Sequence, residues 1–468
     1  MEFNKNTLID KADLILNETA KLGMSQAEVT IKLVDSALTR LANSIIDQNV
    51  SEKHVNVSIF VYHGKKKGSV CVESLDTGSL KRMVARAAKF AEMAPEDEDF
   101  VSIPDPKPFS KKLNPLDLVS KNTLETTPEQ RAEYAQLAIE SAHEIDKRIK
   151  AVAGVISNKT EEKLFKNSLG VEAYDVRTLS KIDLTILGND GREETAGWAA
   201  DSRRDITELK IVEVAKKAAQ KAIDGFGAIL VEPGNYEVVL EPAAAGGLIS
   251  YSSIYGLSAK MYQEYRSFLR DKIGEKSFSE ELDLWSDPLE KRGLIASVFD
   301  GEGVPTQKID LISKGVVKSL AYDTLTASKD GVESTGHNVK LWRVLSFGES
   351  FPLANHLFLK EGDSNIEEMI AETKNGILVT HFHYQNVVNP IKGVFTGLTR
   401  DGTWLIKNGE IDSPVKTLRY TDNVTRYLEK VDLIGKYQEL QDGYNWIFQG
   451  FFPPMKLPSF RFTGSSAK

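Results

Sequence analysis

The sequence predicts an α+β protein, with an N-terminal α/β domain of two helix–sheet–helix units followed by a β-rich, barrel- or sandwich-like C-terminal domain. In the first half, a helical pattern, several strand-like runs and a second helical pattern occur in that order twice, separated by a proline-rich stretch. From Asn235 onward, short strand-like runs dominate and are cut by Gly and Asn turns. These observations predict domains over residues 1–232 and 233–468, with a topological repeat over about 5–95 and 127–224.

The first unit is predicted to begin with a helix over residues 7–22 and to end with a helix over 77–93, because apolar residues recur there at helical spacing. Strands are expected between them, at 27–34, 37–46, 54–63 and 68–74. The run Tyr62-His63-Gly64-Lys65 is typical of a hairpin turn between the last two strands.

The second unit repeats this order. Thr127-Pro128 opens a helix expected to run to about residue 145, and Pro at the first helical turn is favourable there. Strands are expected at 150–157, 161–166, 171–187 and 193–200. The turn Gly188-Asn189-Asp190-Gly191 contains residues that tolerate positive φ, and a helix over 207–223 completes the unit.

In the C-terminal half, the β-branched run Val238-Val239-Leu240 stops at Glu241-Pro242 and leads into a helix-compatible segment rich in Ala and Gly. A strand that runs into such a helix is where many enzymes hold a catalytic group. Further helices are expected near 364–373 and at about 423–434. The run Lys407-Asn408-Gly409-Glu410 is a strong signal for a two-residue hairpin turn.

Composition excludes several classes of protein. The 468 residues contain 59 basic and 67 acidic side chains, a net charge of −8, without a concentrated basic stripe. Because phosphate neutralisation supplies most nucleic-acid affinity, we expect no direct nucleic-acid partner. No window approaches the roughly 18 apolar residues of a membrane span, and the first residues lack the apolar core of a signal peptide. We therefore expect a cytoplasmic protein with no membrane contact.

The chain has one cysteine, Cys71, so it cannot form an intrachain disulfide or a cysteine-rich metal site. Cys71 lies in a strand-like run, Gly68-Ser69-Val70-Cys71-Val72, where we expect a buried, inert thiol.

Two of the seven histidines, His381 and His383, share a local motif, Thr380-His381-Phe382-His383-Tyr384. On a strand, residues i and i+2 point to the same face, so both imidazoles could reach one metal ion. A catalytic zinc needs three protein ligands and an open position, and the sequence identifies no third ligand. The alternative interpretation is a polar strand face.

Six segments carry a resemblance to a known family: LANSIIDQNVSE (41–52), ASVFDGEGVPTQKIDLISKGVVKSLAYD (296–323), STGH (334–337), GLTRDGTWLIKNGEI (397–411), TLRYTDNV (417–424) and PPMKLPSFRFTG (453–464). With them, the chain resembles the TldD/PmbA family of cytoplasmic metalloprotease subunits, also called modulators of DNA gyrase. The segments span nearly the whole chain in the family's order.

The resemblance is to the PmbA branch of this family, also called TldE. In the TldD branch, a His-Glu-x-x-x-His helix follows the strand that corresponds to residues 236–241, and a later cysteine completes the metal site. In this chain Ser250, Tyr251 and Tyr255 fall at those helix positions, and the C-terminal half has no cysteine. Protonated Ser and Tyr hydroxyls are weak ligands beside imidazole or thiolate. We therefore expect no catalytic residue, cofactor or metal in this chain.

The resemblance implies a non-catalytic PmbA/TldE-type subunit of a TldD/TldE-like metalloprotease complex that acts on unfolded peptides. Zinc or iron is then expected in a TldD-type catalytic partner. Two alternatives stay open: a self-sufficient metal-dependent peptidase that uses His381 and His383, and a homodimeric peptide-binding or regulatory protein.

Overall fold

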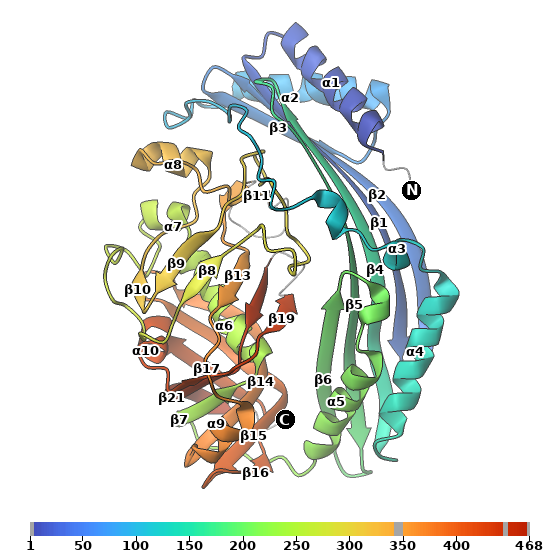
Figure 1. Ribbon diagram of the computed structural model, residues 1–468, viewed down its shortest axis with the longest axis vertical. Helices are drawn as coiled ribbons and strands as arrows, with labels where there is room; N and C mark the ends of the chain where they lie inside the picture. The colour runs from blue at the N-terminus through green and yellow to red at the C-terminus, as the bar shows by residue number, and fades with distance from the viewer. Residues whose placement is uncertain (1–3, 341–349, 443–447, 466–468) are drawn as a thin grey trace.

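Figure 1 shows the computed structural model of the chain, which describes residues 4–340, 350–442 and 448–465. The N-terminal half forms a six-stranded antiparallel sheet, in the order β3-β2-β1-β4-β5-β6, with helices packed on it. The C-terminal half contains a closed β-barrel and a second six-stranded sheet. The predicted fold class is confirmed. Within the described ranges, no helix is both long and apolar enough to cross a membrane.

Each N-terminal unit consists of a helix, three strands and a helix, whereas four strands were predicted between the helices of each unit. The first unit comprises α1 (Lys5–Lys21), β1 (Gln26–Ala42), β2 (Ile45–His63), β3 (Lys66–Val72) and α2 (Thr77–Met93). The second comprises α4 (Pro128–His143), β4 (Ile149–Asn167), β5 (Glu172–Asn189), β6 (Glu194–Arg203) and α5 (Ile211–Asp224). The short helix α3 (Lys121–Leu124) lies in the connection. A capping box between Thr127 and Gln130 begins α4, and the Asp76 carboxylate accepts a backbone N–H at the start of α2.

The two faces of the N-terminal sheet have different surroundings. One face is apolar and packs against α1 and α2 over the first unit and against α4 and α5 over the second. The long strands curve around the C-terminal half, which lies on the other side of the sheet (Figure 1). Because side chains alternate between faces along a strand, each long strand supplies both the core under the helices and the surface that meets the C-terminal half.

The barrel closes because β14 pairs with both β7 and β15. Its strands are β7 (Gly234–Leu240), β14 (Asn375–Asn389), β15 (Val394–Lys407), β17 (Leu418–Asn423) and β21 (Met455–Ser465), with β16 (Glu410–Pro414) and β18 (Leu433–Ile434) attached. Helix α6 (Pro242–Gly256) follows β7 and contacts both β14 and the second sheet. Its apolar residues belong to the core that this half shares.

The second sheet has the order β10-β9-β8-β13-β20-β19. Its strands are β8 (Leu284–Ser286), β9 (Ile309–Ser313), β10 (Val316–Val317), β13 (His356–Leu359), β19 (Glu439–Asp442) and β20 (Gln449–Phe452). A separate pair consists of β11 (Asn338–Lys340) and β12 (Ser350–Pro352). The remaining helices are α7 (Ala259–Gln263), α8 (Thr324–Asp330), α9 (Ile366–Ala371) and α10 (Val424–Leu428).

Several predicted boundaries are wrong, mainly because polar residues inside long strands resemble turns. The strands expected at 27–34 and 37–46 are one strand, β1, in which Asp35 pairs across the sheet with Lys53. The turn comes later, at Asn43 and Ser44, which both have positive φ. The runs 150–157 and 161–166 likewise merge into β4, where Asn158 accepts a hydrogen bond from Arg131. Partners on neighbouring strands and on helix α4 therefore stabilise polar residues that sequence patterns assign to breaks.

Two predicted helices are shorter than expected, and the cysteine is not buried. The helix expected over 207–223 is a short 3-10 turn at Ile206–Glu208 followed by α5. The one expected at 423–434 ends at Leu428, and β18 follows. Cys71 is exposed on β3, where its Sγ accepts a hydrogen bond from Asn56, because the other side of that edge strand faces α2. The buried-thiol interpretation is wrong.

Candidate functional site: the metal-motif helix and the interdomain cavities

Helix α6 begins at an ion-paired carboxylate. Glu241 is its N-terminal cap residue and Pro242 its first residue, as favoured at a helix start. The Glu241 carboxylate lies 3.0 Å from the Lys221 ammonium and 3.5 Å from that of Lys217, both on α5. Burial raises the pKa of Glu241, but these two ammonium groups outweigh burial and hold it below its ordinary value. The contact joins the start of α6 to helix α5 of the N-terminal half.

The structure brings the side chains of Tyr251 and Tyr255 together on one face of α6. Their ring centres are 6.1 Å apart, and both rings pack against Phe395 of β15. Tyr255 is 6% exposed and Tyr251 is half-buried, as expected for side chains four apart on a helix that faces a core. A hydrogen bond joins the two hydroxyls, and the Val387 backbone amide also donates to Tyr251. Burial raises the pKa of both phenols.

This face of α6 does not have the chemistry of a transition-metal site. A phenol with a raised pKa stays protonated at neutral pH, and the hydroxyl of Ser250, the residue before Tyr251, is also neutral. Zinc and iron sites use imidazole, thiolate or carboxylate ligands. On the barrel, Gln385 donates to the Tyr420 hydroxyl at 3.1 Å. In the part of the chain that the structure describes, no group of three or more His, Cys, Asp or Glu side chains is arranged to hold a metal ion.

The two histidines of β14 have different surroundings. The ring of His381 packs 4.5 Å from that of Trp198 on β6, and its Nε2 lies 3.9 Å from the Asp401 carboxylate. Burial, with a contribution from Lys221, lowers the pKa of His381 to about 3. His383 faces a cation, because the Arg400 guanidinium lies 3.0 Å from its Nδ1 and 3.3 Å from its Nε2. A metal at His383 would have to displace this guanidinium.

Charged residues gather on the inner face of the N-terminal sheet, opposite the C-terminal half. The antiparallel register places Lys163 of β4 between Lys32 of β1 and Asp175 of β5, and it places Glu161 opposite Arg177. Glu161 is 3% exposed. It pairs with Lys32 at 2.8 Å, with Lys159 at 2.9 Å and with Arg177. Burial raises the pKa of Glu161, but these three cations hold it well below its ordinary value.

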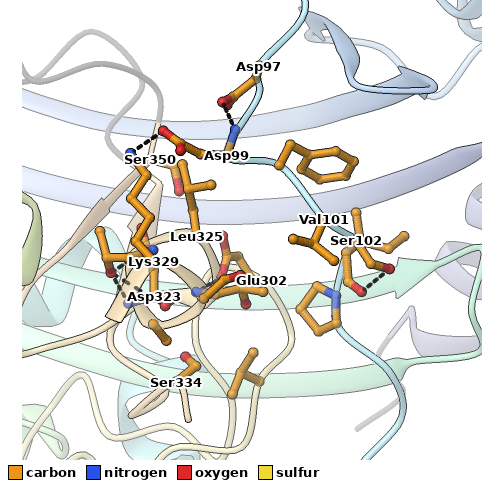
Figure 2. Close-up of a pocket in the computed structure, with 18 of the residues that line it drawn as sticks. Asp97, Asp99, Val101, Ser102, Glu302, Asp323, Leu325, Lys329, Ser334 and Ser350 are labelled. Carbon is orange, nitrogen blue, oxygen red and sulfur yellow. Dashed lines mark hydrogen bonds and ion pairs between the residues drawn. The ribbon is translucent and has the colours of Figure 1, made fainter. Parts of the chain in front are cut away.

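Two cavities lie between this inner face and the C-terminal half. The larger, of about 660 Å³, is lined by β1, the 97–107 connection, α7 and α8. Asp323 and Glu302 both lie in its wall (Figure 2). Burial, with Asp323 and Asp300 nearby, raises the pKa of Glu302 to about 8. Glu302 Oε2 accepts the backbone N–H of Thr324 at the start of α8. The second cavity, of about 350 Å³, lies along the same face.

Sequence reasoning missed both cavities and their charged walls. One signal was available: charged residues recur with a spacing of two at Lys159, Glu161 and Lys163, and again at Asp175 and Arg177. That spacing places them on one face of a strand, where a run of paired charges is unusual for a core. Only the register shows that the two runs face each other, because residues of opposing strands are far apart in the sequence.

Comparison with known proteins identifies the family. The family model described as the PmbA/TldA metallopeptidase C-terminal domain matches residues 233–466. The models for the central domain and domain 1 match residues 121–226 and 27–91. The chain belongs to the TldD/PmbA family. The sequence resemblance is thereby confirmed at the level of the family.

Individual members are distant in sequence but similar over most of their length. The metalloprotease TldD homolog of Haemophilus influenzae is 23% identical over 458 residues, which cover 94% of this chain and 92% of that protein. The metalloprotease PmbA of Escherichia coli O157:H7 is 24% identical over 383 residues, which cover 81% of this chain and 80% of that protein. Members that are named metalloproteases indicate that metal chemistry occurs in this TldD/PmbA family.

Solved structures show the same fold. The crystal structure of TldE from Thermococcus kodakarensis superposes with a TM-score of 0.87 at 24% identity, and the match covers 97% of this chain and all of that one. A Thermotoga maritima protein named as a modulator of a DNA gyrase matches with a TM-score of 0.82 at 21% identity, over 97% of this chain. The arrangement of an N-terminal sheet around a C-terminal barrel is therefore common to these TldD/PmbA-like proteins.

Proposed function

We propose that this chain is a non-catalytic, PmbA/TldE-type subunit of a TldD/TldE-like metalloprotease complex that acts on unfolded peptides. In this proposal, the metal, zinc or iron, is held by a TldD-type partner chain. Membership of a family with named metalloproteases supports the link to proteolysis. The proposal assigns peptide handling, and not bond cleavage, to this chain.

The observation that carries the proposal is the hydroxyl pair on α6. At the helix positions where the TldD branch has a Glu and a His, this chain has Tyr251 and Tyr255, which hydrogen-bond to each other and pack against Phe395. A protonated phenol neither binds Zn²⁺ strongly nor removes a proton from water at neutral pH. A peptidase of this family without a ligand set and a general base at this helix needs another chain to supply them.

The experiment compares the chain alone with the chain co-purified with the TldD-type protein of the same genome. Both samples are incubated with zinc or iron, passed over a desalting column, and analysed for metal and for hydrolysis of an unfolded protein such as reduced casein. We expect less than about 0.1 metal ion per lone chain, no chelator-sensitive hydrolysis by the lone chain, and hydrolysis by the pair that a chelator stops. The control for contaminating proteases is a complex in which a metal-binding histidine of the TldD-type partner is replaced by alanine.

Two results would contradict the proposal, each in a different way. One metal ion held tightly per lone chain, with chelator-sensitive hydrolysis that is lost in His381→Ala and His383→Ala, would support a self-sufficient peptidase. A lone chain that runs as a homodimer, binds peptides and forms no complex with the TldD-type protein would support a regulatory protein. Size-exclusion chromatography with light scattering distinguishes the homodimer from the complex.

A further inference from the structure

One outer face of the C-terminal barrel carries no outward carboxylate. This surface, here called the barrel face, is formed by four paired strand segments: 383–389 of β14, 394–400 of β15, 418–423 of β17 and 461–465 of β21. Asp422 is the one acidic residue in these segments. It lies on the same side of β17 as the buried Tyr420, is 5% exposed and pairs with Arg426. The outward side chains of the barrel face are therefore neutral or positively charged.

The strand register places a neutral row of side chains across the middle of the barrel face. Thr396 of β15 pairs with Asn386 of β14 on one side and with Thr421 of β17 on the other. The Thr421 hydroxyl lies 3.0 Å from the Thr396 hydroxyl and 3.4 Å from the Thr463 hydroxyl of β21. Directly paired residues lie on the same face of a sheet, so these side chains form one uncharged row that can hydrogen-bond.

Exposed arginines lie beside this row. Arg419 is two residues before Thr421 on β17, and Arg461 is two residues before Thr463 on β21. Within residues 4–340, 350–442 and 448–465, neither the Arg419 nor the Arg461 guanidinium forms an ion pair or a side-chain hydrogen bond. A guanidinium presents a planar fork of donors that matches a carboxylate. Both side chains can therefore pair with carboxylates from another molecule.

The β14–β15 hairpin adds exposed apolar side chains to the barrel face. Tyr384 is 73% exposed, Val388 is 57% exposed and Ile391 is 62% exposed. The register of β14 against β15 shifts between His383 and Asn386, and Tyr384 in this bulge has a φ of +52°. This conformation is strained for a residue with a side chain, and bulges of this kind re-aim side chains at functional surfaces. An exposed aromatic ring beside arginines is typical of the residues that dominate protein–protein binding.

A protein with surface carboxylates fits the barrel face better than a nucleic acid or a second copy of this chain. Nucleic acids gain affinity mainly from phosphate neutralisation, which would make no use of Tyr384, Val388 and Ile391. In a symmetric homodimer the same patch meets itself, so two positively charged faces would repel each other. Interfaces between proteins are enriched in Tyr and Arg and depleted in Lys, Glu and Asp, as this face is.

We propose that the barrel face docks an acidic surface of the TldD-type partner chain, with Arg419, Arg461 and Tyr384 as its main contacts. The inference rests on the proposed function, which requires a partner chain, and adds the place where that partner binds. Carboxylates of the partner pair with the two guanidinium groups, and its apolar side chains cover the β14–β15 hairpin. Charge complementarity then selects the catalytic partner over a second copy of this chain.

The test measures the dissociation constant of the complex between this chain and the TldD-type protein of the same genome, by biolayer interferometry at low and at high salt. The variants are Arg419→Glu, Arg461→Glu and Tyr384→Ala, each checked by circular dichroism and thermal midpoint. Lys89→Glu is the matched control for the arginine variants, because it changes the net charge by the same amount. Lys89 is exposed on α2, at the opposite end of the molecule from the barrel (Figure 1).

We expect each of the three variants to weaken the complex at least about tenfold, whereas Lys89→Glu should bind like the wild type. High salt should weaken the wild-type complex and reduce the difference between wild type and the two Glu variants, since salt screens exposed charges. Unchanged dissociation constants in all three variants would overturn the inference. An equal loss of affinity in Lys89→Glu would assign the effect to net charge and would also overturn it.

Other occupants of the barrel face are outcomes of the same experiment. A lone chain that forms a homodimer, which Arg419→Glu dissociates, would assign the face to a second copy and overturn the inference. Duplex DNA that shifts the wild type in a gel but not Arg419→Glu would assign it to nucleic acid, with the same consequence.

Failure of this inference can be separated from failure of the proposed function. An active TldD-type pair whose affinity does not change in the variants would refute only the docking surface. A lone chain with its own chelator-sensitive peptidase activity would refute the proposed function, whatever the variants do to binding. A wild-type chain that forms no complex with the TldD-type protein would overturn both.

Discussion

Replacing Glu161 by Gln should destabilise the protein by about 3 kcal/mol at pH 7. The substitution keeps the shape but removes the carboxylate that pairs with Lys32, Lys159 and Arg177. Loss of one partner of a buried ion pair typically costs about 3–5 kcal/mol, because the remaining charges stay buried without compensation. The side chains of Lys32 and Lys159 are 38% and 25% exposed, so water screens part of their charge and the lower end of that range applies.

The free energy of unfolding is measured by urea titration with circular dichroism. Glu194→Gln is the matched control, because Glu194 pairs with Lys150 but its side chain is 67% exposed. An exposed pair contributes about 0–1 kcal/mol, so the control should stay within that margin. The double substitution Glu161→Gln with Arg177→Gln should cost less than the sum of the single substitutions, since it removes charges of both signs.

The pH dependence has a definite sign. The folded-state pKa of Glu161 lies well below its ordinary value of 4.5. The ionised Glu161 carboxylate therefore makes its full contribution to the free energy of unfolding above about pH 4.5. This contribution is lost as the pH falls through the folded-state pKa. The difference between wild type and Glu161→Gln should be constant from pH 7 to pH 5 and should shrink in more acidic solution. A difference below about 1 kcal/mol at pH 7, or one that grows as the pH falls, would refute the reasoning.

Three further measurements follow from the structure. Tyr255→Ala should lower the free energy of unfolding by about 3–5 kcal/mol, because this ring is 6% exposed and its removal leaves a cavity; Tyr251→Ala, at the half-buried ring, should cost less, and equal costs would contradict the packing. Glu302 has a folded-state pKa raised to about 8 by burial, Asp323 and Asp300, so its ionisation should reduce stability as the pH rises from 4.5 to 8. Glu302→Gln should flatten that decline in urea titrations, and a decline as steep as that of the wild type would contradict the assignment. Gly409→Ala should lower the thermal midpoint, because Gly409 has a φ of +83° and an added Cβ would lie 2.6 Å from the Ala371 carbonyl oxygen.

Local patterns in the sequence were sufficient for several of the helices and tight turns. The helix over 77–93 is found as predicted, and its cap residue, Asp76, precedes it directly. The turn at Asn408 and Gly409 connects β15 to β16, and both residues have positive φ as expected. Capping and turn preferences act over a few residues, so neighbouring side chains are enough to specify them.

The candidate site was predictable only in part. The family resemblance located Ser250, Tyr251 and Tyr255, and helical spacing placed the two tyrosines on one face. Spacing alone also suggested that His381 and His383 could bind one metal ion. The surroundings, Trp198 for one ring and the Arg400 guanidinium for the other, come from other strands and are absent from the local motif.

The amino-acid sequence alone therefore predicts the fold class and the order of most helices and strands, and the family resemblance places Ser250, Tyr251 and Tyr255 at the expected metal-motif positions of α6. It does not show that Lys32, Glu161 and Arg177 form one buried cluster, because these residues meet only through the register of β1, β4 and β5. Turn-like polar runs become strand interiors for the same reason: their cross-strand and interdomain partners are distant in the sequence. Alternation along a strand can be read from local sequence, whereas the neighbour on each face depends on long-range packing of the two halves.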